Sequence, residues 1–426
     1  MNTLYVLKLQ LFDATLVGTI SGSKARGYAF SYHASYLASP SSTPLSASLP
    51  LQPNPFPEQE FRPFFEGLLA EGPARSQLAS QLSLPEDDYL ALLEACGKEC
   101  IGDVVITANP HSNVNGSYQP MAFNDVLSLF SEAPRIFEQN AASRLSLAGT
   151  QNKTGLAHLS PKPMNEGWLK PVGFAATTHI LKTSHIRDIP EIEFLCMKAA
   201  TACGIQAAEV DLIDARKPVL VVKRFDRKAS TNAPFTVNRL HQEDMAQAFG
   251  ILPASKYSEL DGSTITAMAQ FLKRNSIQPA KDIASIAKQL CFAYAIGDCD
   301  AHLKNYSVLI ENSRNGMCCV RLSPAYDFVC TTIFPRFSRE MAMSFGKERD
   351  IDGIKPETFL DLAKQLGIAP RALRAIMKPI ADNILNAISK AGSGACGNVF
   401  DSTPYIADDL VDDIAPRVEI MQEFCS

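Results

Sequence analysis

The chain has 426 residues, of which 46% are hydrophobic and 20% are charged. This composition excludes a disordered or fibrous protein, and the length predicts roughly two or three domains that need neither disulfides nor a metal to fold. Because 45 acidic residues outnumber 40 basic ones, the formal net charge of -5 offers no general attraction to nucleic acid or anionic membranes.

The chain is expected to be cytoplasmic. Lys8, Gln10 and Asp13 interrupt the apolar residues at the amino terminus, so no secretion signal is visible. No segment reaches the roughly 20 apolar residues of a membrane-spanning helix, so we expect no membrane contact. The 11 cysteines are scattered and form no CxxC pair, which favours reduced thiols in the core.

The first hundred residues are expected to combine short strands with helices. Alternating apolar and polar residues predict strands at 7–11, 16–18 and 28–32. Six prolines between 40 and 57 predict an extended loop, and apolar residues at helical spacing predict helices within about 59–97. A polar stretch at 109–116 is the expected linker to the next part of the chain.

The middle of the chain predicts a strand, a helix and two more strands. Their expected positions are 179–182, about 190–203, 210–213 and 218–223. Beyond residue 242 the pattern is mostly helical, with short strands at 306–310 and 319–322 and with helices at 244–249, 264–274, 280–296 and within 356–390. We therefore expect three parts, at 1–108, 109–240 and 241–426.

The strongest chemical signal is the loop Gly-Asp-Cys-Asp-Ala-His-Leu-Lys-Asn at 297–305. Asp300 and Asn305 have the offset at which protein kinases place the carboxylate that takes a hydroxyl proton and an amide oxygen that binds magnesium. Asp327 follows a later strand and would be the second magnesium ligand. One carboxylate and one amide oxygen suffice, because Mg²⁺ takes few ligands from a protein. A cap or turn explains either aspartate alone, whereas the pair favours phosphoryl transfer.

A lysine that ends a strand adds to this signal. Kinases use such a lysine, here Lys182, on the nucleotide phosphates, and a helix glutamate, here Glu193, holds it in place. A solvated lysine on an edge strand is the alternative. Small and polar residues at 146–155 would let backbone N–H groups approach phosphate, although the segment matches neither the Walker A pattern nor the usual kinase glycine-rich loop.

Two other polar motifs have structural interpretations. His302 is interpreted as a hydrogen-bonded residue of a tight loop, with contact to substrate or phosphate as the alternative. Gln242, Glu243 and Asp244 open a predicted helix, which indicates capping of its amino terminus rather than catalysis.

Taken in order, these motifs resemble the HipA family of bacterial serine/threonine kinase toxins. The resemblance spans nearly the whole chain and rests on segments 44–51, 64–69, 145–154, 178–182, 224–227, 242–245, 300–305 and 326–327. It implies an α+β, two-lobed, protein-kinase-like fold related to PI-kinases. That fold would carry an extra amino-terminal β-rich subdomain and an all-helical carboxyl-terminal lobe.

The resemblance also implies roles for individual residues. Asp300 would be the catalytic base, and Lys182 and Asn305 would be the other catalytic residues. Glu193 would hold Lys182 in place. Asn305 and Asp327 would bind Mg²⁺. The residues expected to contact ATP are Ala148, Gly149, Thr150, Gln151, Asn152, Lys153, Lys182, Lys223, Arg224, Phe225, His302, Lys304 and Asp327.

Two departures from the usual patterns limit this comparison. The hinge position Lys223 is acidic in the best-known family member, which leaves backbone contacts to adenine as the expected ones. Asp298 and Cys299 precede Asp300 where eukaryotic kinases have His-Arg, so activation through an arginine-paired phosphosite is not expected.

Family members phosphorylate themselves on a serine just before the small-residue loop and thereby become inactive. Here that serine is Ser146. A phosphate adds about -1.5 to -2 charges, next to a loop that must itself lie against ATP phosphates. The alternative is that Ser146 only starts a turn.

The resemblance implies an ATP- and Mg²⁺-dependent protein kinase that is the toxin of a toxin–antitoxin pair. Its partner would be a small helix-turn-helix antitoxin of the HipB type, which would supply most of the affinity for operator DNA. The substrate would be a protein, by analogy a translation factor or a tRNA synthetase. Two alternatives stay open: a catalytically weak nucleotide-binding scaffold or corepressor, and a small-molecule or lipid kinase.

Overall fold

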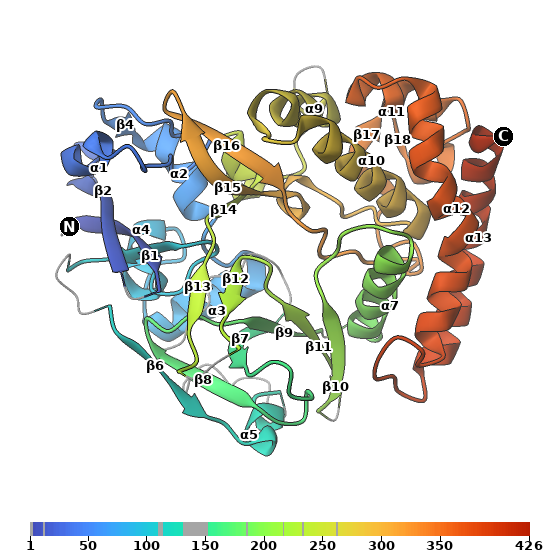
Figure 1. Ribbon diagram of the computed structural model, residues 1–426, viewed down its shortest axis with the longest axis horizontal. Coiled ribbons are helices and arrows are strands. Elements are labelled where there is room, and N and C mark those ends of the chain that lie inside the picture. The colour runs from blue at the N-terminus through green and yellow to red at the C-terminus, as the bar shows by residue number, and fades with distance from the viewer. Residues whose placement is uncertain are drawn as a thin grey trace. The chain divides into compact units, whose positions relative to one another are not determined.

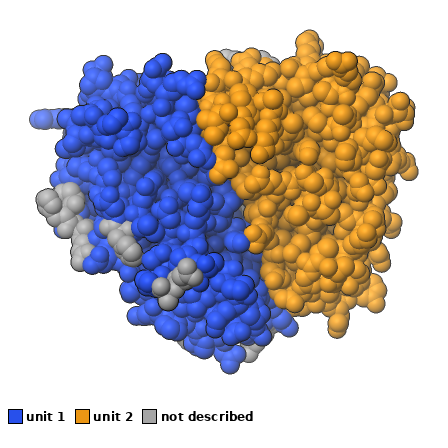
Figure 2. Space-filling model, viewed as in Figure 1, with its two compact units in different colours: residues 1–185, 213–254, 308–319 blue, residues 186–212, 255–307, 320–426 orange. Residues whose placement is uncertain are grey.

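The computed structural model describes residues 3–11, 13–109, 114–130, 152–184, 186–215, 217–231, 234–260 and 263–426. The chain forms two compact units, coloured blue and orange in Figure 2, and each is assembled from three separate segments. Unit 1 contains residues 1–185, 213–254 and 308–319, and unit 2 contains residues 186–212, 255–307 and 320–426. The expected boundaries after 108 and after 240 remain predictions.

Unit 1 begins with a five-stranded antiparallel sheet, which confirms the predicted β-rich start (Figure 1). Its strand order is β4-β3-β2-β1-β5. The strands are β1 (Leu4–Gln10), β2 (Asp13–Ser23), β3 (Gly27–Tyr32), β4 (Phe56–Pro57) and β5 (Val104–Thr107), and the short helix α1 (Ala34–Ala38) follows β3.

The predicted helical stretch at 59–97 consists of three helices: α2 (Glu58–Glu66), α3 (Gly72–Leu82) and α4 (Tyr89–Cys96). Phe61, Phe64 and Phe65 recur at the spacing of one helix face and are fully buried. Phe65 packs against Phe30 of β3, with 5.5 Å between the ring centroids. Burial of these rings stabilises the sheet by the hydrophobic effect and fixes α2 on it.

A second sheet has the strand order β10-β11-β9-β7-β8-β6. Its strands are β6 (Gly116–Pro120), β7 (Asn152–His158), β8 (Trp168–Gly173), β9 (His179–Thr183), β10 (Val210–Asp214) and β11 (Pro218–Lys223). Helix α5 (Phe123–Ser128) follows β6, and a hairpin of β12 (Arg227–Ala229) and β13 (Val237–Arg239) follows β11. The strands predicted near 179, 210 and 218 are therefore confirmed.

The helices of unit 2 are α7 (Ile189–Ala202), α9 (Thr264–Asn275), α10 (Pro279–Ile296), α11 (Thr358–Leu366), α12 (Pro370–Gly392) and α13 (Thr403–Cys425). In α12 the apolar residues Leu373, Met377, Ile380 and Ile384 repeat every three or four positions and are fully buried, which explains why this segment is helical. No helix among the described residues is long and apolar enough to cross a bilayer.

The segment 241–426 is rich in helices but not all-helical, which corrects the expectation. It also contains β14 (Gln242–Asp244), β15 (Ser307–Arg314), β16 (Met317–Leu322), β17 (Glu340–Phe345) and β18 (Glu348–Asp350). Short helical turns lie at α8 (Met245–Ala248), η1 (Pro253–Ser255), η2 (Leu303–Asn305) and η3 (Ile351–Gly353). Strands β17 and β18 pair through only a few residues, too short for a sequence pattern to reveal them.

Asp244 caps a helix, as predicted, whereas Gln242 and Glu243 lie in strand β14 instead of opening the helix. The carboxylate of Asp244 accepts a hydrogen bond from the N–H of Gln247 at 2.9 Å, and the Gln247 side chain accepts one from the N–H of Asp244 at 3.0 Å. This reciprocal pair is a capping box. Glu243 is fully buried between these groups and the segment 44–51, where its Oε1 accepts a hydrogen bond from the N–H of Ala47 at 2.9 Å.

Burial raises the pKa of Glu243 to about 8, so the folded protein keeps this carboxyl neutral up to about pH 8. The raised pKa of Glu243 therefore contributes to the free energy of unfolding. This contribution is complete below the ordinary pKa of 4.5 and is lost as the pH rises through about 8. We expect Glu243→Gln to flatten this fall, which in the wild type reaches at most about 1.4 kcal/mol per pH unit. Urea unfolding of both proteins between pH 5 and pH 9 measures it, and parallel stability curves would contradict the assignment.

Candidate functional site

The residues expected to act on ATP fall into two groups, one in each unit. Unit 1 contains Asn152, Lys153, Lys182, Lys223, Arg224 and Phe225, and unit 2 contains Glu193, Asp300, His302, Lys304, Asn305 and Asp327. Ser146, Ala148, Gly149, Thr150 and Gln151 lie outside the described residues. The expected pairing of Lys182 with Glu193 stays a prediction.

The loop that carries Asp300 starts at the carboxyl end of α10. Gly297 ends this helix with φ of 73°, a left-handed conformation that favours glycine. A Cβ atom there would lie 2.0 Å from Oγ1 of Thr332, so no other residue fits without a local shift. The carbonyl of Gly297 accepts hydrogen bonds from the N–H groups of Thr331 and Thr332 at 3.1 and 3.2 Å. These contacts fix the direction in which the loop leaves the helix.

Asp298 organises the loop from its buried side. Its Oδ1 accepts a hydrogen bond from the N–H of Asp300 at 3.0 Å, and its carboxylate also accepts one from the N–H of Val329. Burial, followed by the charges of Asp300 and Asp327, holds the pKa of Asp298 well above its usual range. Asp298 therefore connects the Asp300 loop to the segment that follows Asp327.

Asp300 itself is exposed, and Tyr257 contacts it directly. The Tyr257 hydroxyl donates a hydrogen bond to Oδ1 of Asp300 at 2.6 Å. The tyrosine ring also meets the His302 ring edge-on, with 5.1 Å between centroids, and Arg349 Nη2 donates to the Tyr257 carbonyl at 3.2 Å. The phenol therefore occupies one of the two carboxylate oxygens of Asp300.

The His302 side chain is buried, and its Nδ1 has no hydrogen-bond partner among the described residues, so the role of the imidazole stays a prediction. Burial, followed by the charge of Lys256, lowers its pKa to about 3, so the imidazole is neutral near pH 7. The main-chain N–H of His302 donates to the carbonyl of Asp300 at 2.7 Å. The main-chain carbonyl of His302 accepts a hydrogen bond from the N–H of Asn305 at 2.9 Å. These two main-chain bonds hold Asp300 and Asn305 in one tight loop.

The end of the loop is tied to the Asp327 segment through Tyr326. The Tyr326 hydroxyl donates to the carbonyl of Lys304 at 2.7 Å and lies 2.5 Å from Oγ of Ser307. Asp327 follows directly and has φ of 62°, a strained conformation for a non-glycine residue that is typical of functional positions.

The residues in unit 2 fit a magnesium ion. Oδ1 of Asn305 is buried and has no hydrogen-bond partner among the described residues, which is costly unless a ligand binds it. The charges of Asp300 and Asp327 both raise the pKa of buried Asp298, so negative charge gathers on this side of the loop. An amide oxygen and carboxylates are ligands that Mg²⁺ prefers. Asn305 and Asp327 would hold the ion.

Helix α13 supports the loop, which the sequence did not indicate. Nε of Arg417 donates to the carbonyl of Ala295 at 3.1 Å, and its Nη2 pairs with Asp413 at 2.5 Å. Asp413 in turn accepts a hydrogen bond from Thr332 Oγ1 at 2.6 Å. These contacts could not be predicted from the sequence, because the residues are far apart along the chain. The buried Arg417 on the apolar face of its helix is the unusual feature that points to them.

In unit 1, Lys153 on β7 lies directly opposite Lys182 on β9. Residues directly opposite each other in an antiparallel pair share one face of the sheet, and like charges in such positions repel. Lys182 is also buried, with 6% of its surface exposed. Two neighbouring cations of this kind suit an anionic ligand such as a phosphate chain.

In the predicted hinge at 223–225, the side chain of Arg224 forms ion pairs inside unit 1. Arg224 is buried, and its guanidinium donates to Asp226 at 2.7 and 2.9 Å and to Glu99 at 3.2 Å. Its N–H donates to the carbonyl of Thr178 at 2.9 Å. The side chain of Arg224 therefore serves the core of unit 1, and contact between 223–225 and a nucleotide stays a prediction.

Comparison with known proteins gives a consistent result. Residues 11–107 match the family model described as the HipA N-terminal domain, and residues 145–388 match the HipA-like C-terminal domain. The protein named "Putative kinase Y4mE" of Sinorhizobium fredii is 30% identical over 96% of this chain and 97% of its own length. The serine/threonine-protein kinase toxin HipA of Shewanella oneidensis is 27% identical, over 92% of this chain and 90% of its own.

The fold agrees with these sequence matches. A solved complex of the toxin–antitoxin proteins HipA and HipB of Shewanella oneidensis with operator DNA contains a chain that matches with a TM-score of 0.81. That match has 22% identity and covers 98% of this chain and 99% of that one. The structure therefore has a two-lobed, kinase-like fold, and the chain belongs to the HipA family.

Proposed function

We propose that this protein is an ATP- and Mg²⁺-dependent serine/threonine protein kinase and the toxin of a toxin–antitoxin pair. The observation that carries the proposal is the 297–305 loop, where main-chain bonds fix Asp300 and Asn305 and the buried Oδ1 of Asn305 has no partner in the described part of the chain. The position of Asp300 favours an active kinase over a catalytically weak scaffold, because a scaffold that only binds nucleotide has no use for a base that takes a hydroxyl proton.

The proposed reaction transfers the γ-phosphoryl group of ATP to a serine or threonine hydroxyl. Asp300 orients that hydroxyl and accepts its proton as the oxygen attacks phosphorus. Lys182 and Lys153 would stabilise negative charge on the phosphate chain. Asn305 and Asp327 would hold magnesium, which would supply positive charge against the phosphate oxygens. ADP leaves with the electrons of the broken P–O bond.

The experiment that tests this proposal measures transfer of label from γ-labelled ATP to protein, including the chain itself. Labelling is expected with Mg²⁺, and we expect it to stop with a chelator and to return when excess Mg²⁺ is added. A chelator-insensitive signal would contradict the metal assignment. A labelled small molecule in place of labelled protein would move the assignment to the small-molecule kinases.

Removal of the Tyr257 hydroxyl should accelerate the transfer. The phenol donates to Asp300 at the position that a substrate hydroxyl needs, so the two compete for one carboxylate oxygen. We expect Tyr257→Phe to raise the initial rate with a protein acceptor by about tenfold or more, because a hydrogen bond to a charged group contributes roughly 1.5 kcal/mol or more. An unchanged affinity for ATP is the control. A slower variant would show instead that the phenol positions Asp300.

Regulation by Ser146 and partnership with an antitoxin extend the proposal. Phosphate on Ser146 would place negative charge beside a loop that must bind phosphate, which would oppose ATP binding. A HipB-like helix-turn-helix protein is the proposed partner, since the solved HipA chain that shares this fold is in a complex with HipB and operator DNA. The net charge of -5 is consistent with DNA affinity that comes mainly from the partner.

A further inference from the structure

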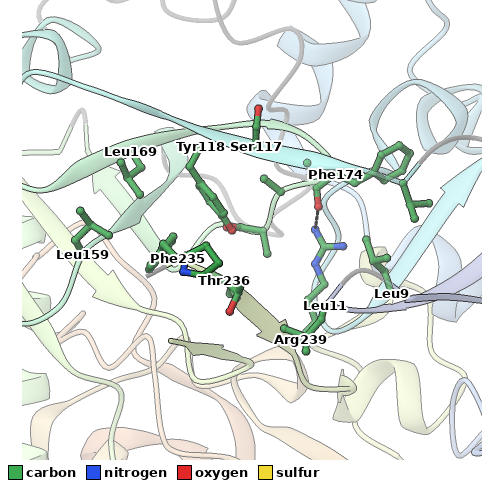
Figure 3. Close-up of a pocket in the computed structure, with 16 residues that line it drawn as sticks. Leu9, Leu11, Ser117, Tyr118, Leu159, Leu169, Phe174, Phe235, Thr236 and Arg239 are labelled. Carbon is green, nitrogen blue, oxygen red and sulfur yellow. Dashed lines mark hydrogen bonds between the residues drawn. The ribbon is translucent and has the colours of Figure 1, made fainter. Parts of the chain in front are cut away.

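Unit 1 contains a cavity of about 450 Å³ (Figure 3). Apolar side chains from strands and loops far apart in sequence line most of it, among them Leu9, Leu159 and Phe174. Two aromatic rings, Tyr118 on β6 and Phe235 before β13, meet edge-on with 4.9 Å between their centroids. A cavity of this size and lining is typical of sites for small organic molecules with an apolar body.

One wall of the cavity contains a buried arginine. Arg239 has 2% of its surface exposed, and its Nη2 donates to the carbonyl of Phe174 at 3.1 Å, the dashed line in Figure 3. The same nitrogen pairs with Glu99. Its Nη1, by contrast, is a buried donor without an acceptor among the described residues. An unsatisfied charged donor is costly, so the site lacks one acceptor.

The charges around Arg239 do not balance. Among the described residues, three buried arginines, Arg224, Arg227 and Arg239, form ion pairs with two carboxylates, Glu99 and Asp226. Despite burial, the arginines hold the pKa of both carboxyls well below the usual range, so each contributes a full negative charge. The cluster therefore retains one positive charge in the interior, where an unpaired charge is strongly disfavoured.

We propose that this cavity binds a small organic carboxylate with an aryl or alkyl body. The carboxylate accepts the hydrogen bond that Nη1 of Arg239 can still donate and neutralises the excess positive charge. The apolar body lies against Tyr118 and Phe235. A neutral compound of the same shape would bind more weakly, because it leaves the charge of the cluster unbalanced. The site lies within unit 1 and does not depend on the proposed kinase activity.

The test compares two probes of the same carbon skeleton, 4-phenylbutyrate and 4-phenylbutan-1-ol, by isothermal titration into the full chain. We expect the carboxylate to bind at least about tenfold more tightly, which corresponds to about 1.4 kcal/mol. Arg239→Met is expected to abolish this preference. Equal affinities of the two probes for the wild type would overturn the proposal, as would absence of binding.

A second variant locates the site without disturbing the charge cluster. Leu159 lines the cavity and is only half-buried, so Leu159→Trp should fill space and weaken binding of the carboxylate by about tenfold or more. The matched control is Leu360→Trp on α11 in unit 2, an exposed leucine that should leave binding unchanged. Unaltered binding by the Leu159 variant would contradict this location, and thermal melting of each variant confirms that it is folded.

Discussion

Asp300→Asn is expected to lower the rate of phosphoryl transfer by about 10² to 10⁴, the range that a positioned general base contributes. The amide keeps the size of the carboxylate and can still accept a hydrogen bond from Tyr257, but it cannot take up the proton of an attacking hydroxyl. Affinity for ATP should change little, since the carboxylate is assigned to the acceptor rather than the nucleotide. Single-turnover labelling and nucleotide titration measure the two quantities separately.

The control for this variant is Asp352→Asn in the same unit. Asp352 pairs with Arg339, and 53% of its side chain is exposed. Loss of such a surface pair costs at most about 1 kcal/mol and should leave the rate unchanged. If Asp300→Asn transferred phosphate as fast as the wild type, Asp300 would not be the base.

Glu99→Gln is expected to destabilise the protein by about 3 to 5 kcal/mol, the usual cost when one member of a buried charge network is removed. Glu99 is 5% exposed and lies against three arginines, with Arg224 and Arg227 both at 3.2 Å. The glutamine can still accept the hydrogen bond from the N–H of Thr177, which is 3.0 Å long with the wild-type carboxylate. The loss therefore reports the charge and not the shape. Urea unfolding at constant pH measures it.

The matched control for stability is Glu166→Gln. Glu166 forms an ion pair with Lys162 at 3.5 Å, and 56% of its side chain is exposed. We expect a change below about 1 kcal/mol, because water screens an exposed pair. A similar decrease in the free energy of unfolding in both variants would show that burial does not make the ion pairs of Glu99 more important than an exposed pair.

Sequence patterns predicted the regular elements well where one periodicity dominates. The strands around 179 and 218 and the helices around 264, 280 and 370 follow directly from apolar spacing and from Gly297, which ends α10. The strands β17 and β18 escaped because they are short and adjoin irregular loops. The all-helical expectation, which came from the family resemblance, also conflicts with β15 and β16, whose strand patterns are visible in the sequence.

The candidate site was only partly readable from the sequence. Asp300, Asn305 and Asp327 have a recognisable order, whereas Tyr257 meets Asp300 from 43 positions away and has no motif of its own. Arg417 supports the loop from the last helix, and only the folded chain brings it there. The side chain of Arg224 belongs to a buried charge cluster that no sequence motif indicated, while contact between 223–225 and a nucleotide stays a prediction.

Intact-mass spectrometry of the full chain before and after incubation with Mg-ATP tests the central claim most directly. Peptide mapping around Ser146 and a parallel sample of Asp300→Asn complete the experiment. From an unphosphorylated start, the wild type is expected to gain the mass of one phosphate on Ser146, and the variant is expected to gain none in the same time. No added phosphate on the wild type, or equal gain in both proteins, would contradict the assignment of Asp300 as the base of a self-regulating kinase.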